Sequence, residues 1–322
     1  MTSRHAPWQT SADGQSAAKI WPWVLADDFA RLFKGDLARA VLNQWNANLA
    51  LVSGAAGFFS PRALTPWLWP DGSLGATNYY DTSFLASTLE RLVDFDRVNS
   101  GVVRLSIGAV NVRSGNLAYF DTTKRRIEAK HVMVSGALLP GFPAVEIDGE
   151  HYWDGGLVSN TPLHWIVEAR PQRDTLAFQI DLWSAQGQFP RNMANVARRQ
   201  KEIQYSSRTR AASIRFTEMQ CLRNSISVLL DKLPPDLKEG PEYAILRRFS
   251  ERKVCNLIQL IYRAKEYDDD SKDYEFSRQS MKDHWRAGYY DTVRTLRHPE
   301  VLERPSGADG VFTFDVAAHG RD

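Results

Sequence analysis

The sequence has few cysteines and no long apolar run. Its two cysteines, Cys221 and Cys255, stand far apart among 322 residues, which excludes a disulfide framework and suits a reducing compartment. The longest apolar stretch, Leu49–Phe59, is too short to span a bilayer. We expect it to be buried in the core, with a surface-inserting loop as the alternative. The first residues have no apolar region of a secretory signal, so we expect a cytoplasmic protein.

Charge of one sign and clustered histidines are also scarce. The net charge of +2 is too small for a chain that binds nucleic acid as a polycation. The seven histidines form no set of metal ligands. His164 and Glu168 are four residues apart, but a metal site needs a third ligand, so we expect a surface pair. His151, in the hairpin before Asp154, is expected to pack beside a strand, with a place at the border of the pocket as the alternative. We expect neither a metal nor a cofactor.

What the sequence does have is ordinary globular composition, 43% hydrophobic and 24% charged. Its length allows one large domain or two modest ones. Tryptophan is concentrated near the beginning, which indicates either buried aromatic area or an exposed face that expects a partner. Six of the ten tryptophans precede residue 71: Trp8, Trp21, Trp23, Trp45, Trp67 and Trp69.

Hydrophobic periodicity predicts alternating helices and strands in the first half of the chain. Asp148-Gly149 lies between alternating residues, which is typical of a two-residue hairpin turn. Asn160-Thr161-Pro162 has the pattern of a helix start. The expected helices cover 36–51 and 82–95, and the expected strands cover 102–112, 117–120, 131–134, 145–153 and 176–182.

The second half is mainly helical by periodicity and uneven in charge. Residues 190–265 have sixteen Lys and Arg against seven Asp and Glu, and residues 266–283 are acidic. The basic stretch faces anionic lipid headgroups or is the solvated face of amphipathic helices. Nucleic-acid binding is not expected, because no recognition motif accompanies the charge. A further helix is predicted over 276–296, and the last twenty residues are predicted to be a loose tail.

One segment has the pattern of a site. Tyr152 and Trp153 end a strand, and Asp154 follows on a turn made by Gly155 and Gly156. Glycines allow the backbone to approach another group closely. Such a turn holds one carboxylate rigidly at the edge of a pocket.

This segment, Tyr152–Leu163, resembles the Asp-Gly-Gly motif of the patatin-like phospholipases. Ser135–Pro143 resembles the stretch that precedes the motif in bacterial members. Gln200–Arg208 and Lys272–Ser277 resemble a C-terminal extension of uncharacterised role in a bacterial subgroup. The resemblance covers about residues 36–299.

The resemblance implies an α/β protein, a three-layer α/β/α sandwich followed by a mainly helical extension. It implies a serine–aspartate dyad in which the serine attacks an ester carbonyl, Asp154 takes its proton, and backbone amides stabilise the oxyanion. The expected divisions are a divergent segment 1–35, a partial patatin-like domain 36–183, a helical extension 184–300 and a tail 301–322.

The nucleophile is what the sequence lacks. No serine lies in Gly-x-Ser-x-Gly, and no glycine-rich oxyanion loop occurs. Ser73 and Ser106 come closest, each without the first glycine. Ser106 is the nucleophile candidate, but a weak one. Its neighbours alternate as a strand, whereas a nucleophile elbow needs a sharp strand-to-helix turn. The family's mechanism cannot run on an aspartate alone, and the sandwich is expected to be incomplete at its N-terminal side.

Two hypotheses follow. The first is a lipid acyl hydrolase with Asp154 as general base, whose nucleophile is unconventional, supplied by a complementing chain or encoded upstream. Its substrate is a lipid or another acyl ester, and the protein contacts membranes peripherally. The second is a catalytically inactive truncated homologue that binds lipid or a protein partner.

Overall fold

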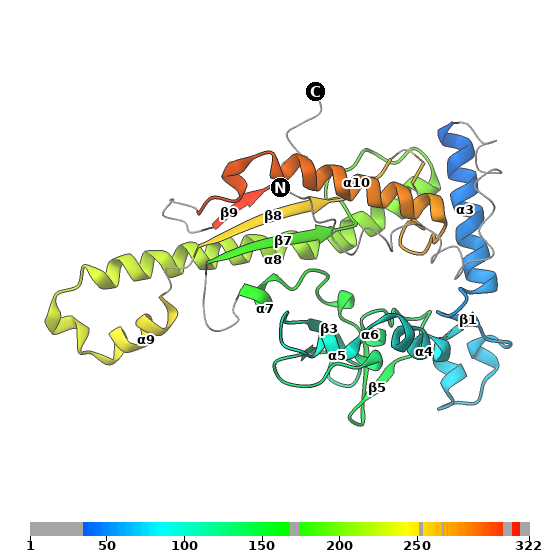
Figure 1. Cartoon of the computed structure of the whole chain (residues 1–322), viewed down its shortest axis with the longest axis horizontal. Coiled ribbons are helices and arrows are strands. Elements are labelled where there is room, and N and C mark those ends of the chain that lie inside the picture. The colour runs from blue at the N-terminus through cyan, green and yellow to red at the C-terminus, as the bar shows by residue number, and fades with distance from the viewer. Residues whose placement is uncertain are drawn as a thin grey trace, which may run out of the picture. The chain divides into compact units, whose positions relative to one another are not determined.

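A computed structural model of the protein describes residues 35–167, 174–250, 254–265, 267–268, 270–304 and 311–315. The chain divides into two compact units (Figure 1). The first unit comprises the chain up to Val158 together with residues 266–282. The second unit comprises Ser159–Lys265 and the chain from Asp283 onward. The boundary after Val158 lies before the expected end of the patatin-like domain at residue 183.

The first unit begins with the predicted amphipathic helix α3 (Asp36–Ser53), which buries Leu42 and Ala47. The apolar stretch Leu49–Phe59, which was expected in the core, is only partly buried: Phe59 is buried, whereas Val52 is exposed. The predicted 82–95 helix is confirmed as α4 (Ser83–Leu92), followed by the single turn α5 (Phe95–Val98). Short elements precede α4: β1 (Ser60–Pro61), η2 (Pro66–Leu68), η3 (Leu74–Thr77) and β2 (Tyr80–Asp81).

A four-stranded antiparallel sheet forms the core of the first unit. Its strands are β3 (Ser106–Asn111), β4 (Leu117–Asp121), β5 (Val145–Ile147) and β6 (Glu150–Asp154), in the order β4-β3-β6-β5. The turn predicted between β5 and β6 is confirmed, because Asp148 and Gly149 both have positive φ, 54° and 79°. Left-handed backbone at both positions matches the twist of a tight hairpin.

The strand predicted over 131–134 is wrong. Residues Ala129–Val134 form the helix α6, whose N-terminus is closed by a capping box. The Glu128 N–H donates to His131 Nδ1 over 3.0 Å, and the Glu128 carboxylate accepts from the backbone of His131. A four-residue apolar run fits a helix or a strand equally, and the reciprocal cap favours the helix. Val134 on α6 packs into the core of the sheet with Ile107 and Phe120.

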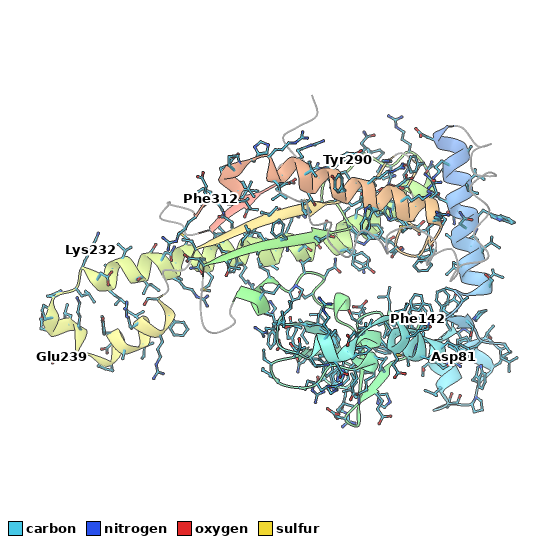
Figure 2. All side chains as sticks on the ribbon, viewed as in Figure 1. Asp81, Phe142, Lys232, Glu239, Tyr290 and Phe312 are labelled. Atoms are coloured by element: carbon cyan, nitrogen blue, oxygen red, sulfur yellow. The ribbon has the colours of Figure 1, made fainter. Side chains whose placement is uncertain are left out.

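An aromatic cluster joins distant parts of the first unit. Phe59 lies 4.9 Å from Tyr80 and 5.2 Å from Phe142, measured between ring centroids. Phe58 lies 6.1 Å from Phe276. Phe142 is labelled in Figure 2. The cluster therefore connects two of the stretches that resemble the family, Ser135–Pro143 and Lys272–Ser277.

The second unit contains a three-stranded parallel sheet in the order β7-β8-β9. The strands are β7 (Thr175–Asp181), β8 (Cys255–Ile261) and β9 (Val311–Phe314). The predicted strand over 176–182 is confirmed as β7. One face of β7 is buried, whereas Leu176, Phe178 and Ile180 on the other face are exposed.

Helices make up most of the rest of the second unit. They are α7 (Leu163–Val167), α8 (Met193–Asp231), η5 (Pro235–Lys238), α9 (Pro241–Phe249), η6 (Pro299–Val301) and α10 (Arg278–Leu296), the last of which begins in the first unit. Figure 2 labels Lys232 and Glu239 near the turn between α8 and α9. The buried face of α8 contacts the sheet, where the Ser213 hydroxyl donates to the side-chain oxygen of Gln179 over 3.3 Å.

The prediction of a helical C-terminal part is confirmed, with two strands added. β8 lies in the stretch expected to be helical, and β9 lies in the segment expected to be a tail. Mixed helices and sheets place the chain in the α/β class, as expected. Among the described residues, none of the helices is long and apolar enough to cross a membrane.

Candidate active site

Asp154 is the last residue of β6 and lies opposite Ala109 of β3 in the antiparallel ladder. Its backbone N–H leaves the ladder and donates to the carbonyl of Ala137 over 3.1 Å. Ala137 belongs to the stretch that continues to Phe142 in the aromatic cluster. The backbone at Asp154 is therefore held from both the sheet and this stretch.

The two glycines after Asp154 form the turn that the sequence predicts. They begin the 3₁₀ helix η4 (Gly155–Leu157), and Asp154 is its N-cap. Asp154 Oδ1 accepts a hydrogen bond of 2.8 Å from the Gly156 N–H. A Cβ atom at Gly155 would lie 2.7 Å from the carbonyl carbon of Gly108 on β3. Only glycine fits there, because real Cβ atoms essentially never come within 3 Å of heavy atoms outside their own residue and its chain neighbours.

The electrostatics of this position favour proton uptake by Asp154. Burial raises the pKa of the Asp154 carboxyl group, and the hydrogen bond from Gly156 opposes that rise without cancelling it. In the part of the chain that the structure describes, Gly156 is the hydrogen-bond donor to this carboxylate, and Oδ2 accepts no other bond. Oδ2 is therefore the oxygen at which a proton could be received.

Ser106 is not next to Asp154. It begins β3, three residues before Ala109, which places it roughly 10 Å along the strand from the residue opposite Asp154. Its hydroxyl donates instead to Asp121 Oδ2 on the neighbouring strand β4. Ser106 is followed by the rest of β3 and not by a helix, so this serine does not lie on a nucleophile elbow.

Asp121 is a fully buried carboxylate with an arginine partner, which the sequence did not point out. Arg104 donates to its Oδ2 through Nε, over 2.7 Å, and Nη2, over 2.6 Å. The backbone and hydroxyl of Thr123 donate to Oδ1 over 2.8 and 2.6 Å. Burial acts to raise the pKa of Asp121, but the hydrogen bonds from Arg104, Ser106 and Thr123 outweigh it and hold the pKa well below its usual range. Such a carboxylate is a structural anion and a poor proton acceptor.

The remaining candidates lie apart from Asp154 or form no site. The Ser73 hydroxyl donates to the Pro70 carbonyl over 2.7 Å, in the loop before η3. His151 is exposed on β6 and His164 is exposed on α7, whereas Glu168 lies outside the described residues. No group of three or more His, Cys, Asp and Glu side chains in the described ranges could hold a metal ion.

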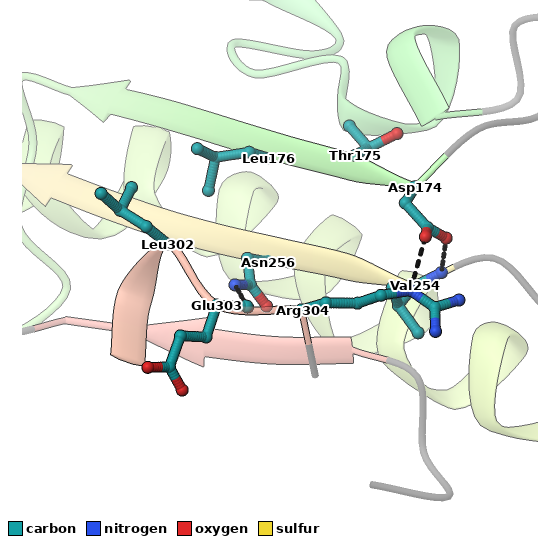
Figure 3. Close-up of a pocket in the computed structure, with 8 residues that line it drawn as sticks. All are labelled: Asp174, Thr175, Leu176, Val254, Asn256, Leu302, Glu303 and Arg304. Atoms are coloured by element: carbon teal, nitrogen blue, oxygen red, sulfur yellow. Dashed lines mark hydrogen bonds and ion pairs between the residues drawn. The ribbon is translucent and has the colours of Figure 1, made fainter. Parts of the chain in front are cut away.

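A cavity of about 240 Å³ lies in the second unit, where β7 and β8 begin (Figure 3). One of its two acidic residues, Asp174, is already bound by Arg304 over 2.6 Å and by the Val254 N–H over 3.0 Å. The hydrogen bond from Arg304 is the main reason that the pKa of Asp174 lies below its usual value. In parallel sheets, ligands bind at the carboxyl ends of strands, and this cavity lies at the opposite ends. Its lining residues are Asp174, Thr175, Leu176, Val254, Asn256, Leu302, Glu303 and Arg304.

Comparison with known families gives two matches, both to models of patatin phospholipases. Residues 13–165 match the model of patatin-like phospholipase, and residues 203–308 match a second model, described as patatin phospholipase. The chain belongs to the patatin-like phospholipase family. No curated protein matches it.

Membership in the patatin-like phospholipase family makes the chain a homologue of lipid hydrolases that act on lipid esters. The first match begins at residue 13, before the expected start of the resemblance at residue 36. It includes Asp154, Gly155, Gly156 and Ser106. The second match includes most of α8, all of α9 and β8, and all of α10. The extension is therefore part of the family likeness, as the resemblance of Gln200–Arg208 and Lys272–Ser277 predicted.

Two residues in the first of these extension stretches have clear packing roles. Tyr205 on α8 stacks on the buried ring of Trp183, with ring centroids 5.6 Å apart. Glu202 is buried and accepts a 3.1 Å bond from Arg199. The Tyr205–Trp183 stacking fixes the N-terminal part of α8 near the end of β7, whereas the Glu202–Arg199 bond lies within α8. The stretch therefore has a structural role within the second unit.

Proposed function

We propose that this protein is a lipid acyl hydrolase in which Asp154 is the general base. The observation that supports the proposal is a carboxylate whose pKa is raised by burial, fixed on a two-glycine turn, whose Oδ2 accepts no hydrogen bond from the described residues. Family membership supports a lipid ester as the substrate class.

The proposed reaction has two steps. A serine oxygen attacks the ester carbonyl carbon while its proton passes to Asp154, and the tetrahedral intermediate then expels the alcohol, which takes that proton. Water next attacks the acyl-serine and gives a proton to Asp154, which returns it to the serine as the fatty acid leaves. In both steps the aspartate must be ionised when the attack begins.

The nucleophile in this proposal is a serine outside any Gly-x-Ser-x-Gly sequence of this chain, or a serine of a complementing chain. Ser106 is disfavoured as that nucleophile, because its hydroxyl is bound to Asp121 and lies far along β3 from the Asp154 position. Peripheral contact with membranes belongs to the same proposal, since lipid esters are found in bilayers. A cytoplasmic location is proposed on the cysteine content alone.

An inactive homologue that binds lipid or a protein is the second candidate. It is favoured by a specific observation: among the described residues, no serine hydroxyl is hydrogen-bonded to Asp154. A dyad requires the nucleophile and its base to come within hydrogen-bond reach. The two candidates differ in whether any serine of the chain becomes reactive.

A fluorophosphonate probe separates them. The purified full chain is incubated with the probe, and covalent adducts are found by intact mass and peptide mapping, beside Asp154→Asn and Ser106→Ala. The hydrolase proposal predicts one labelled serine in the wild type and in Ser106→Ala, and none in Asp154→Asn. No adduct on a folded wild-type chain would overturn a self-contained hydrolase and support the inactive homologue.

If a complementing chain supplies the serine, labelling appears only on mixing. The same experiment is therefore repeated with a fraction of the source cell from which the protein has been depleted. Ester hydrolysis that depends on both components and is lost with Asp154→Asn would support the split enzyme. Equal hydrolysis with wild type and Asp154→Asn would contradict a role for this aspartate.

A further inference from the structure

A loop in the first unit presents large apolar side chains to solvent. We define the Trp67 loop as residues Arg62–Gly75, which contain η2 and the start of η3. Trp67 is 86% exposed, Leu74 is 73% exposed and Leu68 is 69% exposed, and Leu64 is about half exposed. Apolar residues scattered singly on a surface are ordinary, but four on one short loop mark an interaction site.

Internal contacts hold the Trp67 loop in this form. The indole Nε1–H of Trp69 donates to the Leu64 carbonyl over 3.2 Å, and the Trp69 ring lies against Gly75, where a Cβ atom would come within 2.4 Å of it. At the base of the loop, Arg62 Nε donates to the buried Asn78 over 2.8 Å. The inward residue Trp69 therefore packs the loop, while Trp67 and Leu68 beside it point to solvent.

The charge of the loop restricts what it can bind. Between Ala63 and Tyr80 the sequence has a single charged residue, Asp71, and Arg62 at the base of the loop balances it. None of the four exposed apolar side chains carries a charge for an anionic headgroup, and the indole N–H of Trp67 is the one hydrogen-bonding group among them. Tryptophan and leucine are the residues that settle at the boundary between headgroups and acyl chains.

The size of the surface argues against a second copy of the chain. The four side chains expose roughly 600 Å² of apolar surface, below the ~800 Å² that each partner contributes to a standard protein interface. Small apolar protrusions of this kind suit insertion into a fluid surface, which needs no shape complementarity. We propose that the Trp67 loop inserts into the surface of an electrically neutral phospholipid bilayer. The choice of lipid as the partner rests on the proposed function, because a lipid hydrolase must reach its substrate in a bilayer.

Vesicle flotation tests the inference on the full chain. Wild type is mixed with phosphatidylcholine vesicles and floated through a density gradient, beside the double variant Trp67→Ser and Leu68→Ser. The matched control is Phe189→Ser, which removes an aromatic side chain that is 91% exposed in the second unit. We expect the double variant to partition at least tenfold more weakly, and the control to partition like wild type.

Salt and lipid charge provide the second readout. Binding through the neutral loop should be unchanged between 0.1 and 0.5 M NaCl and should not require anionic lipid, because no ion pair is involved. Circular dichroism establishes that the double variant is folded, which its exposed positions favour. Asp154→Asn should float like wild type, so loss of hydrolysis and loss of binding are separate outcomes.

Several results would overturn the inference. Wild type that stays at the bottom of the gradient would do so, as would a double variant that floats as well as wild type. Binding that needs anionic lipid and disappears in salt would assign membrane contact to the basic helices instead. A wild-type dimer in sedimentation that becomes a monomer in the double variant would make the loop a contact between copies.

Discussion

Ser106 and Asp121 face each other across the β3–β4 hairpin, and the Ser106 hydroxyl donates to the buried Asp121 carboxylate. The pairing turns the serine that most resembles a nucleophile into one donor of a structural network. Arg104 and Thr123 complete that network. The first two predictions concern its energetics.

Asp121→Asn should destabilise the protein by about 2–3 kcal/mol, because it leaves the Arg104 guanidinium without its carboxylate. Urea unfolding at pH 7 measures the change. The matched control is Asp96→Asn, whose ion pair with Arg126 is exposed and should contribute little. Since the pKa of Asp121 is lowered on folding, its contribution is present above the ordinary aspartate pKa and is lost as pH falls below about 4. An equal loss in both variants would contradict this account.

Ser106→Ala should lower the free energy of unfolding by about 1 kcal/mol, the typical value of one hydrogen bond. Asp121 keeps its other donors, so the loss should be smaller than in Asp121→Asn. Fluorophosphonate labelling should be unchanged. Loss of the adduct with normal stability would identify Ser106 as the nucleophile and refute the assignment of this residue to the network.

Asp154→Asn should stabilise the protein at neutral pH. Burial raises the pKa of Asp154 on folding, so the wild type loses stability as pH rises through the interval above the ordinary aspartate pKa. Asparagine keeps an oxygen for the Gly156 N–H and has no charge to bury. We expect the Tm to rise by about 1–3 °C at pH 7, with the difference vanishing near pH 3. A Tm below that of wild type at pH 7 would contradict a raised pKa.

Hydrolysis should depend on the ionised form of Asp154, whereas stability favours the protonated form. If Asp154 is the general base, hydrolysis requires its ionised form and should fall as pH drops through its raised pKa. A pH–rate profile of kcat/KM for a neutral ester measures this limb. A limb that persists unchanged in a partly active Asp154→Asn would assign the titration to another group.

Gly155→Ala should cost about 2–3 kcal/mol, because the new methyl group would overlap the backbone of Gly108 and push η4 away from β3. Thermal or urea unfolding gives the loss. Gly136→Ala is the control, since a Cβ atom there meets its nearest neighbour, the Met133 carbonyl, at an ordinary 3.8 Å. Similar losses in the two variants would show that crowding at Gly155 is not the cause.

Local sequence determined the hairpins and the long helices, and it pointed to the turn at Asp154. Asp148-Gly149 and the glycines after Asp154 specify backbone geometry within a few residues, so their structure could be predicted. The network around Asp121 could have been found from the β3–β4 hairpin, because the turn near Ser114 sets the register that pairs Ser106 with Asp121.

Elements that depend on distant partners could not be predicted in this way. β9 is four residues in a segment expected to be a tail, and it is a strand because it pairs with β8. α6 was predicted as a strand because its apolar run is short, and the deciding bond joins His131 to Glu128, which lies before that run. Among the described residues no serine is hydrogen-bonded to Asp154, so neither the sequence nor this part of the structure assigns the nucleophile.

The parallel sheet of the second unit also has a consequence for synthesis of the protein. Gln179 on β7 and Gln259 on β8 are hydrogen-bonded over 2.9 Å although 80 residues separate them, and β9 is made later still. Pairings over such separations form slowly. On the ribosome, β7 must therefore emerge with its apolar residues unpaired and wait for β8 and β9. During that interval its exposed apolar residues would make it a segment on which a chaperone could act.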